Sequence, residues 1–482
     1  MAAKKFYITT TLPYVNDDPH IGFALEIVQA DIQARYHALM GDEVFFNTGT
    51  DEHGLKIYRK ATEQGKDTQK YTDEYAEKFR ALKDKLNLYP ELHFIRTTDE
   101  HHKLAAQKFW NLCLEAGDIY KKNYEVKYCV GCELEKTESE LVDGKCPIHP
   151  NLSVELINEE NYFFRWSKYQ KLLLEMYEKR PDFVMPDFRF NEIKAFVERG
   201  LQDFSISRQK EKMPWGVSVP GDDKHVMYVW FDALVNYIST LGWPEDEKAF
   251  EKFWGTVKKP NAIQVAGKDN LRQQSAMWQA MLMSAGLPTS KQIVIHGFIT
   301  SGGQKMSKSL GNVINPYSIV DEYGADALRY FLARHISPFE DSDFTMARFK
   351  EAYNADLANG LGNLTARIMT LAETNLEAPI KKPKETKFSK EWISAIESFQ
   401  FNRALEIVWS KIQKLDQKIN ETAPFKLIKS DPKAGRKLIA QLATELYYIA
   451  RMLNPFMPET NKVILEAILA NKKPVNMFPR KE

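Results

Sequence analysis

Residues 5–23 read KFYITTTLPYVNDDPHIGF, and this stretch decides the fold. Its first part, Lys5 to Thr11, alternates and is rich in β-branched residues, which predicts a buried strand. Turn-forming residues follow, and apolar residues then recur at the helical period until Gly41. A second strand-like run covers Glu43 to Asn47. The order strand, turn, helix, strand predicts a parallel α/β unit, in which the turn at the helix N-terminus is where phosphates bind.

Two short motifs carry the candidate phosphate chemistry. His20 and Gly22 lie at the predicted turn, where a histidine beside a small residue can approach a phosphate group. Taken alone, this histidine would more often be a loop or capping residue. Far along the chain, Lys305 and Lys308 are separated by Met-Ser in a loop that paired glycines open. Such a cationic loop can stabilise charge on a leaving phosphate, although short basic runs are usually solvated loops.

The composition limits the class of protein. The chain has 482 residues, 44% of them hydrophobic and 27% charged, which predicts a globular protein of two to four domains. The sequence offers no apolar segment of signal or membrane-spanning length, so we expect a cytoplasmic protein that does not contact a membrane. The net charge of +1 neither supports nor excludes a nucleic-acid partner, because binding needs only a local basic face.

Three of the four cysteines lie close together in the sequence and indicate a metal site. Cys129 and Cys132 form one pair, and Cys146 with His149 forms a second pair at the same spacing. Two such pairs predict a closed tetrahedral site for one structural Zn²⁺. A redox CxxC motif is the ordinary alternative, but it would stand alone and open a helix.

Several phrases together resemble the class I aminoacyl-tRNA synthetases, and their methionine branch in particular. The His20–Gly22 turn and the lysine loop are similar to the two signatures of the class, although Phe23 occupies the position of the second signature histidine. Further matching phrases run in the same order through the chain: 12–16 (LPYVN), 47–54 (NTGTDEHG), 228–233 (YVWFDA), 267–269 (GKD) and 354–363 (NADLANGLGN).

The resemblance implies an α/β fold with four segments. A Rossmann-type parallel-sheet catalytic domain (1–115 and 226–345) would be split by a connective insertion with the zinc knuckle (116–225). An all-α helical-bundle anticodon-binding domain (346–482) would follow. The implied reaction is ATP-dependent activation of L-methionine, with Mg²⁺ bound to ATP, and transfer of the methionyl group to the 3′ end of tRNA(Met). The chain offers no room for an appended dimer-forming domain, so we expect a monomer.

The resemblance also assigns roles to individual residues. His20, Gly22, Lys305 and Lys308 would hold the triphosphate, with Lys268 and Asp269 near the ribose and adenine, and Arg208 is either a further phosphate contact or a surface arginine. The methionine pocket would use Leu12, Tyr14, Asp51, Trp230, Tyr237 and His296, in which aromatic faces suit a thioether. Asn363, Arg367 and Phe425 would bind the anticodon, with nearby lysines along the RNA backbone.

Three departures from the family pattern bear on these roles. Phe23 removes one phosphate donor, Asn270 replaces an apolar residue beside the Gly-Lys-Asp phrase, and Phe425 replaces a tryptophan that stacks on an anticodon base. Because Phe23 removes this donor, one alternative is a catalytically silent paralogue that only binds tRNA. Synthetases for leucine, valine, isoleucine or cysteine are a second alternative, but the insertion is short for an editing domain and the metal ligands lie together. A small-molecule nucleotidyltransferase would not need a helical RNA-binding half.

Overall fold

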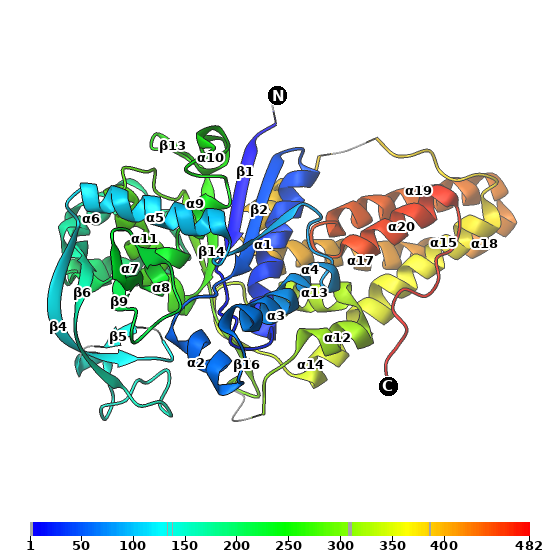
Figure 1. The fold of residues 1–482 in the computed structure, drawn as a ribbon. Helices are drawn as coiled ribbons and strands as arrows, with labels where there is room; N and C mark the ends of the chain where they lie inside the picture. The colour runs from blue at the N-terminus through cyan, green and yellow to red at the C-terminus, as the bar shows by residue number, and fades with distance from the viewer. Residues whose placement is uncertain (1–2, 133, 137, 307–310, 385–386) are drawn as a thin grey trace.

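A six-stranded parallel sheet forms the centre of the computed structural model, which describes residues 3–132, 134–136, 138–306, 311–384 and 387–482 (Figure 1). The strands are hydrogen-bonded in the order β3-β2-β1-β14-β15-β7, and every neighbouring pair is parallel. This architecture confirms the predicted α/β class. The strands are β1 (Lys5–Thr10), β2 (Glu43–Thr50), β3 (Leu92–Arg96), β7 (Val184–Met185), β14 (Ala262–Gly267) and β15 (Gln292–His296).

The opening unit has the predicted order. Strand β1 is followed by helix α1 (Ile21–Leu39) and then by β2, and β1 lies between β2 and β14. Chain order reverses across the β1–β14 pair, because strands earlier in the sequence lie on one side and later strands on the other. Ligands of open parallel sheets bind at the carboxyl ends of the strands at this reversal. The sequence motifs at the ends of β1, β14 and β15 therefore meet at one edge.

A second, antiparallel sheet belongs to the segment between the two halves of the central sheet. Its strand order is β5-β4-β6-β8, and β4 and β6 form a long ribbon that extends from the body of the molecule (Figure 1). The short strand β7 also comes from this segment, yet it pairs with β15 at the edge of the central sheet. The strands are β4 (Ile119–Cys129), β5 (Leu134–Lys136), β6 (Glu155–Phe164) and β8 (Phe204–Ser205).

Helices and short strands cover the central sheet and frame its carboxyl edge. The helices are α2 (Leu55–Glu63), α3 (Thr68–Arg80), α4 (Leu82–Lys85), α5 (Glu100–Glu115), α6 (Gln170–Lys179), α7 (Asp187–Glu198), α8 (Val229–Ala233), α9 (Asn236–Ser239), α10 (Glu247–Trp254), α11 (Trp278–Ser284), α12 (Pro316–Tyr323) and α13 (Ala325–Arg334). The strands are β9 (Ser207–Gln209), β10 (Ser218–Val219), β11 (Asp222–Met227), β12 (Gly255–Thr256), β13 (Lys259–Pro260), β16 (Ile299–Ser301), β17 (Gln304–Lys305) and β18 (Ser342–Asp343).

The C-terminal part of the chain is helical, as predicted, and packs beside the sheet (Figure 1). It contains a π-helix, η6 (Tyr353–Gly362), directly before α15. The other helices are α14 (Met346–Ala352), α15 (Asn363–Asn375), α16 (Lys390–Glu397), α17 (Phe401–Thr422), α18 (Pro424–Ser430), α19 (Pro432–Leu453) and α20 (Pro458–Ala470). Within the described residues, no helix has both the length and the apolar character needed to span a membrane.

The buried Arg329 side chain joins the sheet layer to this bundle. It lies on α13 and forms an ion pair with Asp31 of α1 at 2.6 Å, and neither side chain is exposed. The same guanidinium donates to the carbonyl oxygens of Leu86, Pro455 and Phe456. One side chain thus connects α1, the segment after α4 and the turn between α19 and α20.

Candidate active site

His20 caps the N-terminus of α1, directly after the β1 turn. Its Nδ1 accepts the backbone N–H of Gly22 at 3.0 Å, so the proton of the neutral ring is on Nε2. The side chain meets solvent, but the protein atoms around the ring lower the pKa of His20 and favour the neutral form. A Cβ at position 22 would lie 2.9 Å from the His20 ring, so only glycine leaves room for the cap. His20 is therefore a capping residue, which was one of the interpretations offered by the sequence. Its Nε2–H remains a possible hydrogen-bond donor to a ligand.

Phe23 belongs to the core beneath this turn. It is buried, and its ring makes an edge contact with the ring of Phe79 on α3, with 5.5 Å between the centroids. The aromatic ring at this position packs against apolar neighbours and fills a site in the core.

The end of β14 brings Lys268 and Asp269 to the same edge. Lys268 Nζ forms an ion pair with Asp341 Oδ2 at 2.6 Å and lies over the ring of Phe298. Partial burial disfavours the Asp341 carboxylate, but the hydrogen bonds from Lys268 and from the backbone of Phe298, with the charge of Lys268, together outweigh it and lower the pKa of Asp341. Asp269 is exposed, and Asn270 Nδ2 donates to its Oδ1 at 3.3 Å. Asn270 therefore holds the orientation of the neighbouring carboxylate.

The predicted lysine loop begins in the hairpin of β16 and β17. Gly302 and Gly303 form its two-residue turn, and both have positive φ angles, 62° and 74°, as a tight hairpin turn requires. The backbone N–H of Gly303 donates to Asp343 Oδ1 at 2.8 Å, which ties the turn to β18. The backbone of Lys305 ends β17, whereas Lys308 lies outside the described residues.

The aromatic residues predicted for a thioether pocket meet beside the β1 turn. The ring of Tyr14 makes an edge contact with the ring of Trp230 on α8, with 6.3 Å between the centroids. Tyr14 also forms a parallel bridge with Asp51, which follows β2 and is buried. Leu12 lies half-buried in the same turn. The Trp230 Nε1 donor is buried and has no hydrogen-bond partner within the described part of the chain.

A buried pair joins the β1 turn to the end of β15. His296 Nε2 lies 2.9 Å from Glu26 Oε2, and the other Glu26 oxygen accepts from the backbone and hydroxyl of Thr11. Burial disfavours the charged imidazole, but the hydrogen bond and charge of Glu26, with the Gly297 carbonyl and the charge of Asp269, together outweigh it and raise the pKa of His296. Tyr237 is also buried; burial above all, and then the charge of Glu26, raises its pKa. Its hydroxyl accepts from Gln274 at 2.7 Å.

A second polar network lies behind the aromatic residues and was not predicted from the sequence. Asp232 accepts from His53 at 3.0 Å and from His102 at 3.2 Å, and all three side chains are buried. His102 also contacts the hydroxyl of Ser239 at 2.9 Å. Burial disfavours the carboxylate, but the two histidines outweigh it and lower the pKa of Asp232. The network ties α8, which carries Trp230, to the segment after β2 and to α5.

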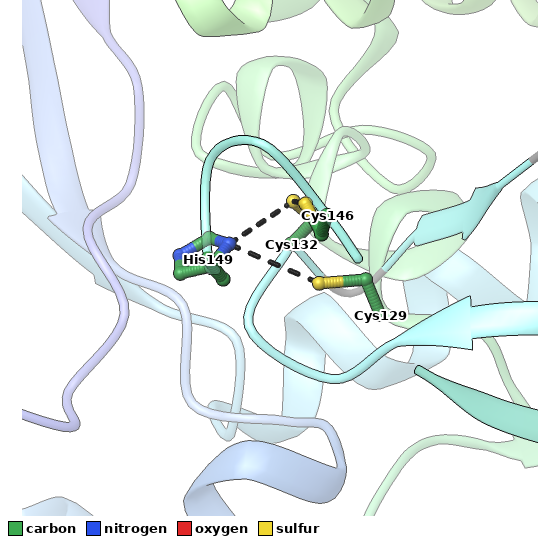
Figure 2. Close-up of side chains that lie close together, drawn as sticks. All are labelled: Cys129, Cys132, Cys146 and His149. Carbon is green, nitrogen blue, oxygen red and sulfur yellow. Dashed lines mark hydrogen bonds between the residues drawn. The ribbon is translucent and has the colours of Figure 1, made fainter. Parts of the chain in front are cut away.

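Cys129, Cys132, Cys146 and His149 converge at the end of β4, as predicted (Figure 2). Their ligand atoms all lie within 4.8 Å of one another, with 3.5 Å between the sulfurs of Cys132 and Cys146. Ligands 2.0–2.3 Å from a tetrahedral Zn²⁺ would be roughly 3.5–3.8 Å apart. Gly131 permits this approach, because a Cβ there would lie 2.5 Å from the His149 ring. The four side chains could hold one metal ion.

Arg208 is not a surface residue. It is buried on β9, and its guanidinium stacks on the rings of Tyr128 and Tyr228, with 5.0 and 4.7 Å to the centroids. It also donates to the hydroxyl of Ser205 at 2.8 Å. The alternative of a surface arginine was therefore wrong, and the role as a phosphate contact stays a prediction. This side chain packs the end of β4 next to Cys129 onto the segment before α8.

The predicted anticodon residues lie at one end of the helical bundle. Asn363 is exposed at the start of α15, and Arg367 one turn later forms an ion pair with Asp416 and a hydrogen bond to Asn420 on α17. Helix α17 leads directly into α18, where the Phe425 side chain is 50% exposed. An exposed amide, a guanidinium and an aromatic ring are thus carried by adjoining helices.

Comparisons with known proteins support the resemblance to the class I aminoacyl-tRNA synthetases. The sequence model of the family described as tRNA synthetases class I (M) matches residues 6–155 and 140–369. A methionine–tRNA ligase from Nostoc sp. is 42% identical over 486 residues, covering 97% of this chain and 90% of that protein. One from Thermotoga maritima is 41% identical and covers 98% and 76%. The structure of Mycobacterium tuberculosis methionyl-tRNA synthetase in complex with methionyl-adenylate superposes with a TM-score of 0.89 at 33% identity, covering 99% of this chain and 100% of that chain.

Proposed function

This chain belongs to the class I tRNA synthetases of the methionine type, and from that premise we propose which of its residues act in each step. The enzyme joins methionine to AMP with release of pyrophosphate and then transfers the methionyl group to tRNA, releasing AMP. One observation supports the residue assignment. His20, the ends of β14 and β15, and the Tyr14–Trp230 pair all lie at the carboxyl edge of the parallel sheet.

In the first step a methionine carboxylate oxygen forms a bond to the α-phosphorus of ATP, and the bond to the pyrophosphate oxygen breaks. We assign His20 Nε2–H and the N-terminus of α1, with Gly22, to the phosphate oxygens. The neutral form of His20, favoured by its lowered pKa, donates without adding charge. Lys305 and Lys308 would neutralise the leaving pyrophosphate. Lys268 and Asp269 would hold the ribose and adenine.

We assign the methionine side chain to the space beside Leu12, Tyr14 and Trp230, because aromatic faces make favourable contacts with a thioether. The buried Asp51 carboxylate would bind the α-ammonium group. His296 and Tyr237 would close the far side of the pocket, and Glu26 fixes the orientation of the His296 ring.

In the second step a ribose hydroxyl at the 3′ end of tRNA attacks the methionyl carbonyl carbon, and AMP leaves with the bonding electrons. We propose that Asn363 and Arg367 bind the edges of anticodon bases and that Phe425 stacks on one of them. Asp416 and Asn420 hold the Arg367 guanidinium in place before RNA binds.

We propose that the metal of the cysteine cluster is Zn²⁺ and that its role is structural. Four protein ligands fill the tetrahedral site, so no position is left for a substrate. Mg²⁺ would accompany ATP and neutralise phosphate charge. The segments 1–115, 116–225, 226–345 and 346–482, the cytoplasmic location and the monomer stay predictions.

The test is exchange of labelled pyrophosphate into ATP, measured with methionine and with each of the other standard amino acids. We expect exchange with methionine alone, and a roughly 10²–10³-fold loss of kcat in His20→Ala. The exposed His101 supplies the matched control, and His101→Ala should leave exchange unchanged. Exchange that persists in His20→Ala would remove His20 from the phosphate site, and exchange with another amino acid would overturn the assigned pocket.

A further inference from the structure

A buried carboxylate lies between two residues of the candidate site, directly after β2. Glu52 follows Asp51 and precedes His53, and its side chain is not exposed to solvent. Asp51 is assigned to the methionine ammonium group, and His53 binds Asp232 of α8. The short segment around Glu52 therefore carries one proposed ligand of the substrate and one residue of the network behind the pocket.

Arg96, the last residue of β3, binds both oxygens of the Glu52 carboxylate. Its Nε donates to Oε1 at 2.7 Å and its Nη2 donates to Oε2 at 2.8 Å, which makes a bidentate pair. Thr50 lies directly opposite Arg96 on the neighbouring strand β2, so the pair joins the ends of two strands. The hydroxyls of Thr50 and Thr98 each donate to one Glu52 oxygen at 2.6 Å. Each oxygen thus accepts two hydrogen bonds, and the carboxylate is held in one orientation.

The backbone of the same segment is fixed as well. The Glu52 N–H donates to the hydroxyl of Thr97 at 2.9 Å, and the Trp215 indole N–H donates to Glu52 O at 2.6 Å. The N–H of Asp51 donates to Pro13 O in the β1 turn at 3.0 Å. The Asp51 carboxylate is therefore carried by a segment that is bound both to the β1 turn and to the residues after β3.

We propose that Arg96 is a positioning residue for the ammonium group of methionine and that it acts through Glu52 on Asp51. Without the fork of Arg96 the buried Glu52 carboxylate would lose two hydrogen bonds, and the segment would move to satisfy it. A carboxylate binds an ammonium group only when the two groups lie about 3 Å apart, so a small movement of Asp51 weakens binding. Arg96 is itself anchored, because its Nη2 also donates to Asp73 of α3 at 2.6 Å. This inference rests on the proposed assignment of Asp51 to the ammonium group.

The experiment measures pyrophosphate exchange in the full chain with two inhibitors that share a thioether chain and a hydroxyl group. L-Methioninol carries the ammonium group, and 4-(methylthio)butan-1-ol lacks it. Arg96→Lys keeps the positive charge but not the planar fork. It should raise the KM for methionine and the inhibition constant of methioninol roughly tenfold, the effect of weakening a hydrogen bond to a charged group. The KM for ATP and the inhibition constant of the deaminated alcohol should stay unchanged.

Two further variants and one control make the test specific. Thr98→Val removes one donor to Glu52 and keeps the Arg96 pair, so the same two constants should rise by a smaller factor, roughly threefold. In the Asp51→Asn background, Arg96→Lys should have no further effect on methioninol, because Arg96 acts through Asp51. Arg80→Lys is the matched control and should change no constant, since Arg80 at the end of α3 forms an exposed ion pair with Glu77 on its own helix.

Asp51→Asn separates this inference from the proposed function. If Asp51→Asn weakens methioninol alone, but Arg96→Lys and Thr98→Val weaken neither inhibitor or both equally, Arg96 is not a positioning residue and the ammonium assignment stands. An additive effect of Arg96→Lys in the Asp51→Asn background would overturn the inference as well. If Asp51→Asn leaves methioninol unchanged, the assignment of Asp51 is wrong and the role of Arg96 falls with it.

Discussion

Replacing Arg329 by methionine tests whether one buried side chain holds the catalytic layer and the helical bundle together. Arg329→Met keeps most of the side-chain volume but removes the ion pair with Asp31 and the donors to three carbonyl groups. Breaking one partner of a buried ion pair costs about 3–5 kcal/mol. Asp31 keeps its ion pair with Arg35 at 2.8 Å and the N–H of Tyr89, so we expect the lower end, about 3 kcal/mol.

Urea unfolding measures this loss directly. Urea slopes reach about 3 kcal/mol per molar in small proteins and increase with chain size, so a loss of 3 kcal/mol lowers the midpoint by at most about 1 M. The matched control is Arg403→Met, because Arg403 is exposed and makes no side-chain ion pair or hydrogen bond among the described residues. The control should shift the free energy of unfolding by no more than about 0.5 kcal/mol.

The functional consequence should differ between the two reactions. Pyrophosphate exchange uses only the sheet layer, whereas charging needs the bundle and the sheet in a fixed relation, so Arg329→Met should impair charging more than exchange at low urea. Arg329→Lys should recover part of the stability, because it keeps the charge but not the planar fork that serves several acceptors. The same midpoint in Arg329→Met and Arg403→Met would refute this role for Arg329.

Three further predictions concern the site. Cys146→Ala should abolish the bound Zn²⁺, measured by atomic emission, and expose the β4–β6 ribbon to proteolysis; full metal content in the variant would exclude the cluster. Phe425→Ala should raise the KM for tRNA about tenfold with exchange unchanged, and Phe425→Trp should not; equal kinetics in both would contradict stacking. The pKa of His296 is higher in the folded than in the unfolded protein, where it is near 6.5. Its pair with Glu26 therefore contributes its full stability at pH values below about 6.5, and this contribution is lost as the pH rises through the pKa of the folded state. The stability gap between wild type and Glu26→Gln in urea should therefore narrow from pH 6 to pH 9, and a constant gap would contradict the pair.

Local patterns explain why part of the site could be predicted from the sequence. The strand, turn and helix around His20 depend on neighbouring residues, so periodicity predicts them. The metal cluster is likewise local, since its four ligands lie within residues 129–149. The partner of His296 could not be predicted in this way, because Glu26 is 270 positions away in the sequence. Glu26 also lies in a helix that is buried on several sides, and periodicity does not reveal such burial. The same holds for His102, which meets Asp232 only through the packing of α5 on α8.

Contacts between residues far apart in the sequence also determine how the proposed methionine pocket keeps its shape. Trp230 lies on α8, which has five residues, and a helix of that length does not persist without tertiary contacts. Asp232 lies on the same helix and is held by two buried histidines from separate segments. Since a buried hydrogen-bonded carboxylate is costly to displace, the network fixes α8 and with it the Trp230 ring against Tyr14. One methylene group in a hydrophobic pocket changes the binding energy by only about 1–3 kcal/mol. We infer that discrimination between methionine and similar amino acids depends on these polar residues behind the pocket as much as on the aromatic residues that line it.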